Sequence, residues 1–341
     1  MAKIRILSID GGGIRGIIPG TILQVMEEKI QARTGDPQAR LVDYFDFLSG
    51  TSTGGILVCG MLAPASKGSP RPKYFIKDIV ERFHEKGGEI FRMNLLRKIG
   101  NLWGLRDEKY SNRALKESLA EQFGDFSMRE LIKPCLLTAY EIEARRAMFI
   151  TQHDAVRYPY MDFLVRDAVL ATCAAPTYFE PVRIAAAKGD AHVLIDGGVF
   201  ANNPGMCAYA EARKLTFDNI SHPTSEDMLL LSLGTGHVDE GYSFTEARNF
   251  GLVKWIRPLI SIMMSGNSET VSHQLKWLFD AGRNAEGYVR IEPELLNARV
   301  QLDDASKKNM AALREAALRY VEKNESQIDD IVKKLFVNDK L

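Results

Sequence analysis

Ser52 lies between Gly50 and Gly54 in the segment GTSTGG, which directly follows the apolar run 44–48. A serine that attacks an acyl carbon has to project from a tight strand-to-helix turn, where neighbouring side chains would clash, so glycine is expected on both flanks. Residues 56–62 are apolar on every face and predict a buried helix whose N-terminus would direct free N–H groups toward Ser52. The segment predicts a nucleophile elbow, although a plain glycine-rich turn has the same composition.

A second glycine-rich segment, DGGGIRG, begins at Asp10. Its first, third and last glycines match the GxGxxG pattern of dinucleotide-binding loops, but that fold also needs an acidic residue about 20 residues further on, at the end of the second strand. Here the second predicted strand leads into the serine elbow instead. A glycine loop of this kind would also serve an acyl-transfer enzyme, because the amides near Gly12 and Gly13, with that of Thr53, would bind the oxyanion of a tetrahedral intermediate.

A serine hydroxyl needs a base that removes its proton. Histidine is the usual base, and of the six histidines only His237 and His273 come late enough for the α/β-hydrolase order of serine, acid and histidine. Asp196 is a second candidate, because it ends a predicted strand and precedes Gly197 and Gly198, which permit a sharp turn at the edge of the sheet. Burial would raise the pKa of this carboxyl and make it a stronger base. An ordinary Asp-Gly-Gly turn is the alternative.

The elements that would position these groups alternate between strand and helix. A strand over 4–9, a helix from Pro19 to Gly35, the strand before the elbow and the buried helix after it are typical of a parallel sheet covered on both faces. Ligands of such sheets bind beyond the carboxyl ends of the strands, where both glycine loops fall. Further strands are predicted over 136–140, 146–150, 191–198 and 228–233, and further helices over 162–175, 203–214, 250–264, near 271–279 and from 305 to the C-terminus.

Composition excludes several classes of protein. The 341 residues include 44 basic and 44 acidic side chains, so no net charge would attract the chain to nucleic acid. No apolar run reaches the roughly 18 residues of a membrane span, and the first residues do not resemble a signal peptide, so we expect a soluble cytoplasmic protein. The four cysteines are isolated in apolar surroundings, which predicts neither a disulfide framework nor a metal site.

Two segments have the pattern of a membrane-contacting helix. Phe91, Leu95, Ile99 and Trp103 repeat at four-residue intervals among basic residues, and the segment 250–256 also combines aromatic, aliphatic and basic side chains. Such helices lie in membrane interfaces or act as lids, while an ordinary helix packed on the core is the alternative.

The DGGGIRG, GTSTGG and Asp196-Gly197-Gly198 segments, in this order, resemble the three signatures of the patatin-like phospholipase family. Further similarity extends from residue 4 to 236 and includes the segments KYS (109–111), FGD (123–125), AAPTYF (174–179), NNP (202–204) and LSLGTG (231–236). The resemblance implies a three-layer α/β/α sandwich with a largely parallel central sheet. It also implies a catalytic domain over 1–236 and a mainly helical C-terminal region over 237–341 packed on it.

The resemblance also implies a serine lipid acyl hydrolase with a Ser-Asp dyad, acting on phospholipid, lysophospholipid or related glycerolipid esters. Ser52 would be the nucleophile, Asp196 the general base, and the Gly11–Gly13 loop the oxyanion hole, with Arg15 near it. No cofactor, calcium or other metal is implied. The expected partner is a membrane or micellar lipid surface with which the protein makes peripheral contact, and an activating small molecule or protein is an open question. A Ser-His-Asp esterase and a nucleotide-binding protein are the alternatives.

Overall fold

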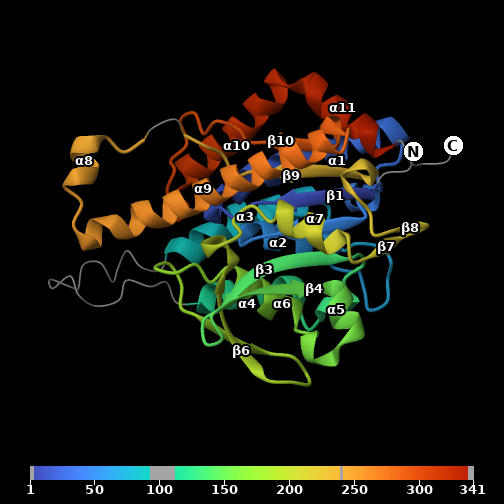
Figure 1. Cartoon of the computed structure of the whole chain (residues 1–341), viewed down its shortest axis with the longest axis horizontal. Helices are drawn as coiled ribbons and strands as arrows, with labels where there is room; N and C mark the ends of the chain where they lie inside the picture. The colour runs from blue at the N-terminus through green and yellow to red at the C-terminus, as the bar shows by residue number, and fades with distance from the viewer. Residues whose placement is uncertain (1–3, 93–111, 239–240, 337–341) are drawn as a thin grey trace.

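The computed structural model describes residues 4–92, 112–238 and 241–336. Across these residues eight strands form one sheet in the order β10-β9-β1-β2-β3-β6-β5, with β4 also paired to β3 (Figure 1). The strands from β10 to β3 are parallel, whereas β4, β5 and β6 run antiparallel to their neighbours. The strands are β1 (Ile4–Ile9), β2 (Phe47–Gly50), β3 (Cys135–Glu141), β4 (Arg146–Thr151), β5 (Val182–Ala185), β6 (Ala191–Asp196), β9 (Met228–Leu233) and β10 (Tyr288–Ile291), and β7 (Thr216–Phe217) and β8 (Ile220–Ser221) form a separate hairpin.

Helices cover both faces of the sheet, as predicted for a three-layer α/β/α sandwich. The helices are α1 (Ile17–Thr34), α2 (Thr53–Leu62), α3 (Ile76–Arg92), α4 (Arg113–Phe123), α5 (Gln152–Arg157), α6 (Val165–Thr172), α7 (Gly205–Ala212), α8 (Phe244–Arg248), α9 (Leu252–Ala281), α10 (Lys307–Lys323) and α11 (Glu325–Leu335). None of them, within the described ranges, has the length and apolar composition that crossing a bilayer requires.

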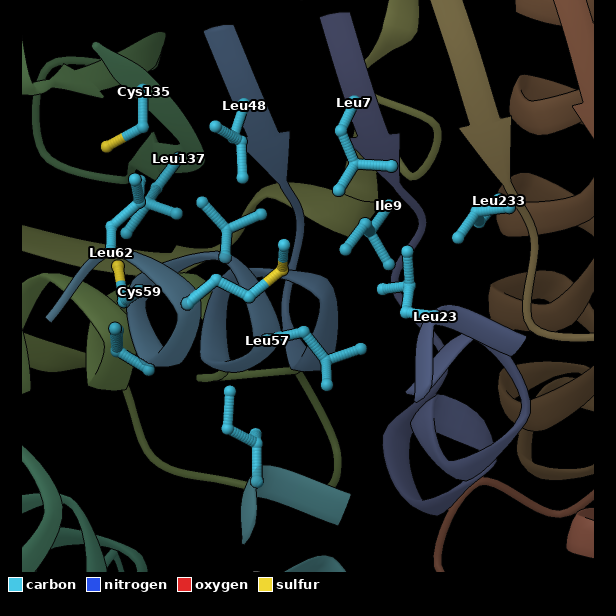
Figure 2. Packing of buried hydrophobic residues seen from close by; sticks show 14 of the residues in the cluster. Leu7, Ile9, Leu23, Leu48, Leu57, Cys59, Leu62, Cys135, Leu137 and Leu233 are labelled. Atoms are coloured by element: carbon cyan, nitrogen blue, oxygen red, sulfur yellow. The ribbon is translucent and has the colours of Figure 1, made fainter. Parts of the chain in front are cut away.

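Alternating side chains of the strands build two cores. Leu7 of β1 and Leu48 of β2 pack with Leu23 of α1 and Leu57 of α2 on one face of the sheet (Figure 2). The neighbouring positions of β1 and β2 point to the opposite face, where they contact a smaller core built from α7 and α9. Because side chains alternate along a strand, the continuous apolar sequence of these strands is explained by burial on both faces.

The arrangement of β2, β3 and β6 determines where two loops meet. β4 pairs with β3 from Leu136 to Glu141, so β2 and β6 share the other edge of β3. β2 runs parallel to β3 and pairs with it as far as Leu137, while β6 runs antiparallel and its last residue, Asp196, pairs with Ala139. The carboxyl ends of β2 and β6 therefore approach each other head-on beside Thr138.

Several predicted elements differ from the structure. The segments expected as two helices over 250–264 and 271–279 are one continuous helix, α9, which also contains Pro258. The helix predicted over 162–175 is shorter at both ends, because α6 begins at Val165 and ends at Thr172. The mainly helical region after 236 also contributes β10 to the central sheet. Most of the stripe from Phe91 to Trp103 lies outside the described residues, as does the segment 109–111.

Phe279 packs α9 against the sheet. It is fully buried and its ring contacts those of Tyr209 and Tyr288, with centroid distances of 6.2 and 6.0 Å. We predict that Phe279→Ala lowers the free energy of unfolding by about 3–5 kcal/mol, because it leaves a cavity. Phe244→Ala, which removes an 80% exposed ring, is the matched control and should change it by less than about 0.5 kcal/mol. Equal effects in denaturant unfolding would show that this contact does not fix α9.

Candidate active site

Ser52 forms the turn between β2 and α2 in a strained backbone conformation, with φ 55° and ψ −123°. A residue other than glycine keeps such a conformation only where its surroundings enforce it. The amide of Ser52 donates a 2.9 Å hydrogen bond to the hydroxyl of Thr172, which in turn donates to the carbonyl of Thr138 at 2.6 Å. These bonds hold the turn in place with Ser52 lining a cavity.

The two glycines beside Ser52 allow backbones to come into close contact. A Cβ on Gly50 would lie 2.4 Å from the carbonyl carbon of Gly54, and a Cβ on Gly54 would lie 2.2 Å from the carbonyl oxygen of Ile9. These neighbours are backbone atoms of the elbow and the sheet and cannot move aside. The structure thus gives a steric reason for both glycines of the predicted elbow.

Asp196 meets Ser52 where β6 ends. Its carboxylate accepts a 2.7 Å hydrogen bond from the amide of Gly198, and it lines the same cavity as Ser52. Gly197 packs against Thr138, whose hydroxyl would lie 2.1 Å from a Cβ at that position, so the turn is as tight as the sequence indicated. Burial raises the pKa of Asp196 to about 7, although the nearby Ser52 hydroxyl and the amide of Gly198 act to lower it.

Two residues of the glycine-rich segments, Gly13 and Thr53, line the same cavity and offer backbone amides. Within the part of the chain that the structure describes, the N–H groups of Gly12, Gly13 and Thr53 have no hydrogen-bond partner. Gly11 differs from the expectation, because its N–H already donates to the carbonyl of Asn202 at 3.1 Å and is not available to an oxyanion. Gly11 instead approaches the nucleophile closely, since its own Cβ position would be 3.2 Å from that of Ser52.

Arg15, expected near the oxyanion hole, is not among the residues that line the cavity. Its guanidinium donates to the carbonyl of Gly236 at 3.4 Å, and its Nε is buried without a partner. Burial lowers the pKa of Arg15, opposed by the nearby carboxylates of Glu292 and Asp10. Its contacts indicate that Arg15 supports the loops beneath the site.

Ser52 and Asp196 lie in a cavity of ≈ 280 Å³. The wall is overwhelmingly apolar and is built from α2, α3, α4 and α9, with side chains such as Phe83, Leu119 and Met263. An apolar cavity that contains a serine hydroxyl, a buried carboxylate and free amides suits a substrate with a long hydrocarbon part and one reactive polar group.

The alternative base, histidine, is not found at this site. No histidine is among the described residues that line the cavity. His153 contacts Glu211 at 2.9 Å and His192 contacts Glu141 at 3.0 Å, while the two late histidines, His237 and His273, are exposed. The geometry therefore gives no support to a Ser-His-Asp triad.

The glycines of the DGGGIRG loop are explained by close packing. A Cβ on Gly12 would lie 2.3 Å from the hydroxyl of Thr235, and one on Gly13 would lie 2.3 Å from the carbonyl of Leu302. At the position where a dinucleotide fold needs an acidic residue, β2 leads into Ser52 instead.

One group of side chains in the described residues has the chemistry of a metal site. The ligand atoms of His153, Asp154 and Glu211 lie within 4.8 Å of one another, outside the cavity. Glu211 is within hydrogen-bond distance of His153 at 2.9 Å and accepts a hydrogen bond from Lys214 at 2.7 Å, so both oxygens of its carboxylate already have partners.

The structure reveals supporting residues to which the sequence analysis gave no role. Asn202 binds Gly11 twice, through its own carbonyl and through its side-chain amide at 3.3 Å, and it also donates to Ser268 of α9 at 3.1 Å. Ser268 and Arg290 bind the carboxylate of Asp10 at 3.0 and 2.7 Å. In the sequence, only the NNP and DGGG segments indicated that these positions have a role. The contacts themselves join residues that are far apart along the chain, so no local pattern predicts them.

A second neighbour of the nucleophile is Cys173, which follows α6. It lines the same cavity, and burial raises the pKa of its thiol well above the ordinary value, opposed by the nearby Ser52 hydroxyl. The thiol therefore stays protonated and contributes packing to the site. The sequence identified Cys173 only as a core residue.

The buried carboxyl of Asp196 predicts a specific pH dependence of stability. The folded protein retains the proton of Asp196 between the unfolded value of 3.8 and the folded value of about 7, so the free energy of unfolding falls as pH rises through this window. Asp196→Asn removes this effect. The variant should gain about 4 kcal/mol relative to wild type between pH 4 and pH 7, as three pKa units imply. Urea unfolding of both proteins from pH 4 to pH 7 gives the difference between their free energies of unfolding, from which the contributions of all other titratable groups cancel. A difference that does not change with pH would contradict the prediction.

Comparison with known proteins agrees with this geometry. The family model described as patatin-like phospholipase matches residues 7–208. Patatin-like protein 1 from Oryza sativa subsp. indica is 32% identical over 331 residues, covering 91% of this chain and 79% of its own, and Patatin-T5 from Solanum tuberosum is 32% identical over 324 residues, covering 91% and 81%.

A further relative, from Solanum tuberosum, is named probable inactive patatin-3-Kuras 1 and is 31% identical, covering 95% of this chain and 88% of its own. Activity therefore has to be argued from the site and not from similarity alone. Among solved structures, VipD from Legionella pneumophila aligns over 95% of this chain and 67% of its own with 12% identity and a TM-score of 0.37, too low to bear on function. On the family match and the extent of the shared sequence, this chain belongs to the patatin-like phospholipase family, which indicates a lipid acyl hydrolase.

Proposed function

We propose that this chain hydrolyses acyl esters of lipids with a Ser52–Asp196 dyad and an acyl-enzyme intermediate. The observation that carries the proposal is that Ser52 and the buried carboxyl of Asp196 line the same apolar cavity, with the Ser52 hydroxyl near enough to lower the pKa of that carboxyl. A carboxyl whose pKa is raised to about 7 is a far stronger base than an ordinary aspartate and is still half ionised at neutral pH.

In the first half of the reaction, Asp196 takes the proton of the Ser52 hydroxyl while its oxygen attacks the ester carbon. The amides of Gly12, Gly13 and Thr53 are the donors we assign to the resulting oxyanion. Collapse of the intermediate breaks the bond to the alcohol, which leaves with the proton from Asp196, and the acyl group stays on Ser52. Water then attacks this ester, again with Asp196 as base, and the fatty acid is released.

The substrate class follows from the cavity. Its apolar wall suits an acyl chain, and two cations of α3, Arg82 and Lys86, also line it. A phosphate or other anionic head group would complement these cations, which favours phospholipid and lysophospholipid esters over neutral glycerolipids.

The proposal extends to location and domain organisation. All four cysteines are free thiols, as expected in a reducing cytoplasmic compartment. A catalytic unit over 1–236 agrees with the site, because Ser52, Asp196 and the free amides come from that part, while β10 and α9 of the remainder complete the sheet and the cavity.

The roles of the dyad can be tested by substitution. Ser52→Ala and Asp196→Asn should each lower kcat for a soluble p-nitrophenyl ester by about 10⁴-fold or more, because each removes a group that acts directly on the reacting atoms. A fluorophosphonate probe should label wild type but not Ser52→Ala. Single replacement of each of the six histidines is the matched control and should preserve most activity. A His237 or His273 variant as inactive as Ser52→Ala would indicate a triad.

The pH profile of catalysis gives an independent test. Asp196 accepts a proton only when ionised, and burial raises its pKa to about 7. We therefore expect kcat/KM to rise about tenfold per pH unit below this value and to level off above it. If the wild-type profile has its inflection near pH 4, another group is the base. The same conclusion follows if the residual rate of Asp196→Asn still has an inflection at pH 7.

A further inference from the structure

Helix α9 exposes an apolar stripe along its first half. Trp255, Leu259, Ile262 and Met263 follow one another at intervals of four, three and one residues and are 38%, 50%, 46% and 42% exposed. A helix at the surface of a soluble domain normally presents polar side chains to water. Figure 1 shows α8 and this half of α9 extending beyond the sheet.

The second half of the same helix follows the ordinary rule except at Trp277, a single aromatic side chain that is 56% exposed. Val271, Leu275 and Phe279 are buried against the sheet, while Glu269 and Gln274 are exposed. The polarity of the outer face therefore changes along one continuous helix. A requirement of helix formation or of core packing would affect both halves alike, so the exposed apolar stripe needs another explanation.

Aromatic side chains extend this surface onto α8 and the loops around it. The ring of Phe250 lies 5.2 Å from that of Trp255 and 5.6 Å from that of Tyr242, which is 50% exposed, and Phe244 is 80% exposed. We call Tyr242, Phe244 and the stripe from Trp255 to Met263 the α8–α9 apolar surface. Tyrosine and tryptophan are the residues that anchor proteins at the level of lipid head groups.

The α8–α9 apolar surface is continuous with the wall of the active-site cavity. Ile260, Met263 and Met264 line the cavity, and Met263 belongs to both surfaces. A lipid surface in contact with the stripe would therefore place acyl chains next to residues that line the cavity.

We propose that the α8–α9 apolar surface docks on the lipid–water interface and inserts its aromatic and aliphatic side chains among the lipids. The proposal rests on the lipid hydrolase function for the identity of the cavity's substrate, but docking itself needs no catalysis. Segment 241–266 contains three basic residues and one acidic residue, so electrostatic attraction is weak. Insertion of apolar side chains supplies the affinity, and zwitterionic vesicles are sufficient.

The test measures sedimentation of the full chain with vesicles of ether-linked phosphatidylcholine, which carry no acyl ester to hydrolyse. Wild type should sediment with them, and Trp255→Glu and Ile262→Glu should each weaken the partition by about tenfold or more. Trp277→Glu is the matched control, because Trp277 is 56% exposed on the same helix but lies outside the surface, and it should bind as wild type does. Unchanged melting temperatures show that each variant is folded.

Four outcomes would overturn the proposal. The first two are that wild type fails to sediment with the vesicles and that all three variants bind them equally well. The third is that binding falls about tenfold between 50 and 500 mM salt, which would indicate electrostatic attraction. The fourth is that wild type forms a dimer that does not bind lipid and that Trp255→Glu abolishes. Hydrolysis of a soluble ester, measured separately, distinguishes a failed docking surface from a failed catalytic proposal.

Discussion

The site depends on how β2 and β6 share one edge of β3. The two strands run toward each other and both end beside Thr138, so the serine elbow and the acidic turn meet head-on. Because hydrogen bonding to β3 fixes the register of both strands, it also fixes the relative positions of Ser52 and Asp196. The side chain of Thr138 contacts both loops, through a 2.7 Å hydrogen bond to Thr51 and close packing against Gly197.

Burial of Asp196 links stability to chemistry. Removing this carboxyl from water disfavours its charged form, which costs stability at neutral pH and at the same time increases the basicity of the carboxylate. The same balance holds for Asp10, whose pKa burial raises to about 6 while Arg290 acts to lower it. Asp10 holds the glycine loop in place, so buried acids support both sides of the reacting centre.

Helix α9 connects surface, cavity and catalytic loops. Its first half carries the α8–α9 apolar surface and part of the cavity wall, and its middle binds the loops through Asn267 and Ser268. Asn267 donates to the carbonyl of Phe200 at 2.7 Å and Ser268 donates to Asp10 at 3.0 Å. Helix α9 therefore contacts both the glycine loop and the acidic turn.

The sequence by itself determined the parallel α/β sheet, the buried strands, the serine elbow and the acidic turn, because apolar alternation, glycine spacing and strand-ending loops are local properties of the chain. It also identified Ser52 and Asp196 as candidates. Only the tertiary structure decided that these two side chains meet, that the amide of Gly11 is occupied, and that Asn202, Ser268 and Arg290 support the loops. It also joined the predicted segments 250–264 and 271–279 into one helix. Contacts between distant segments depend on strand order and register, which no local pattern encodes.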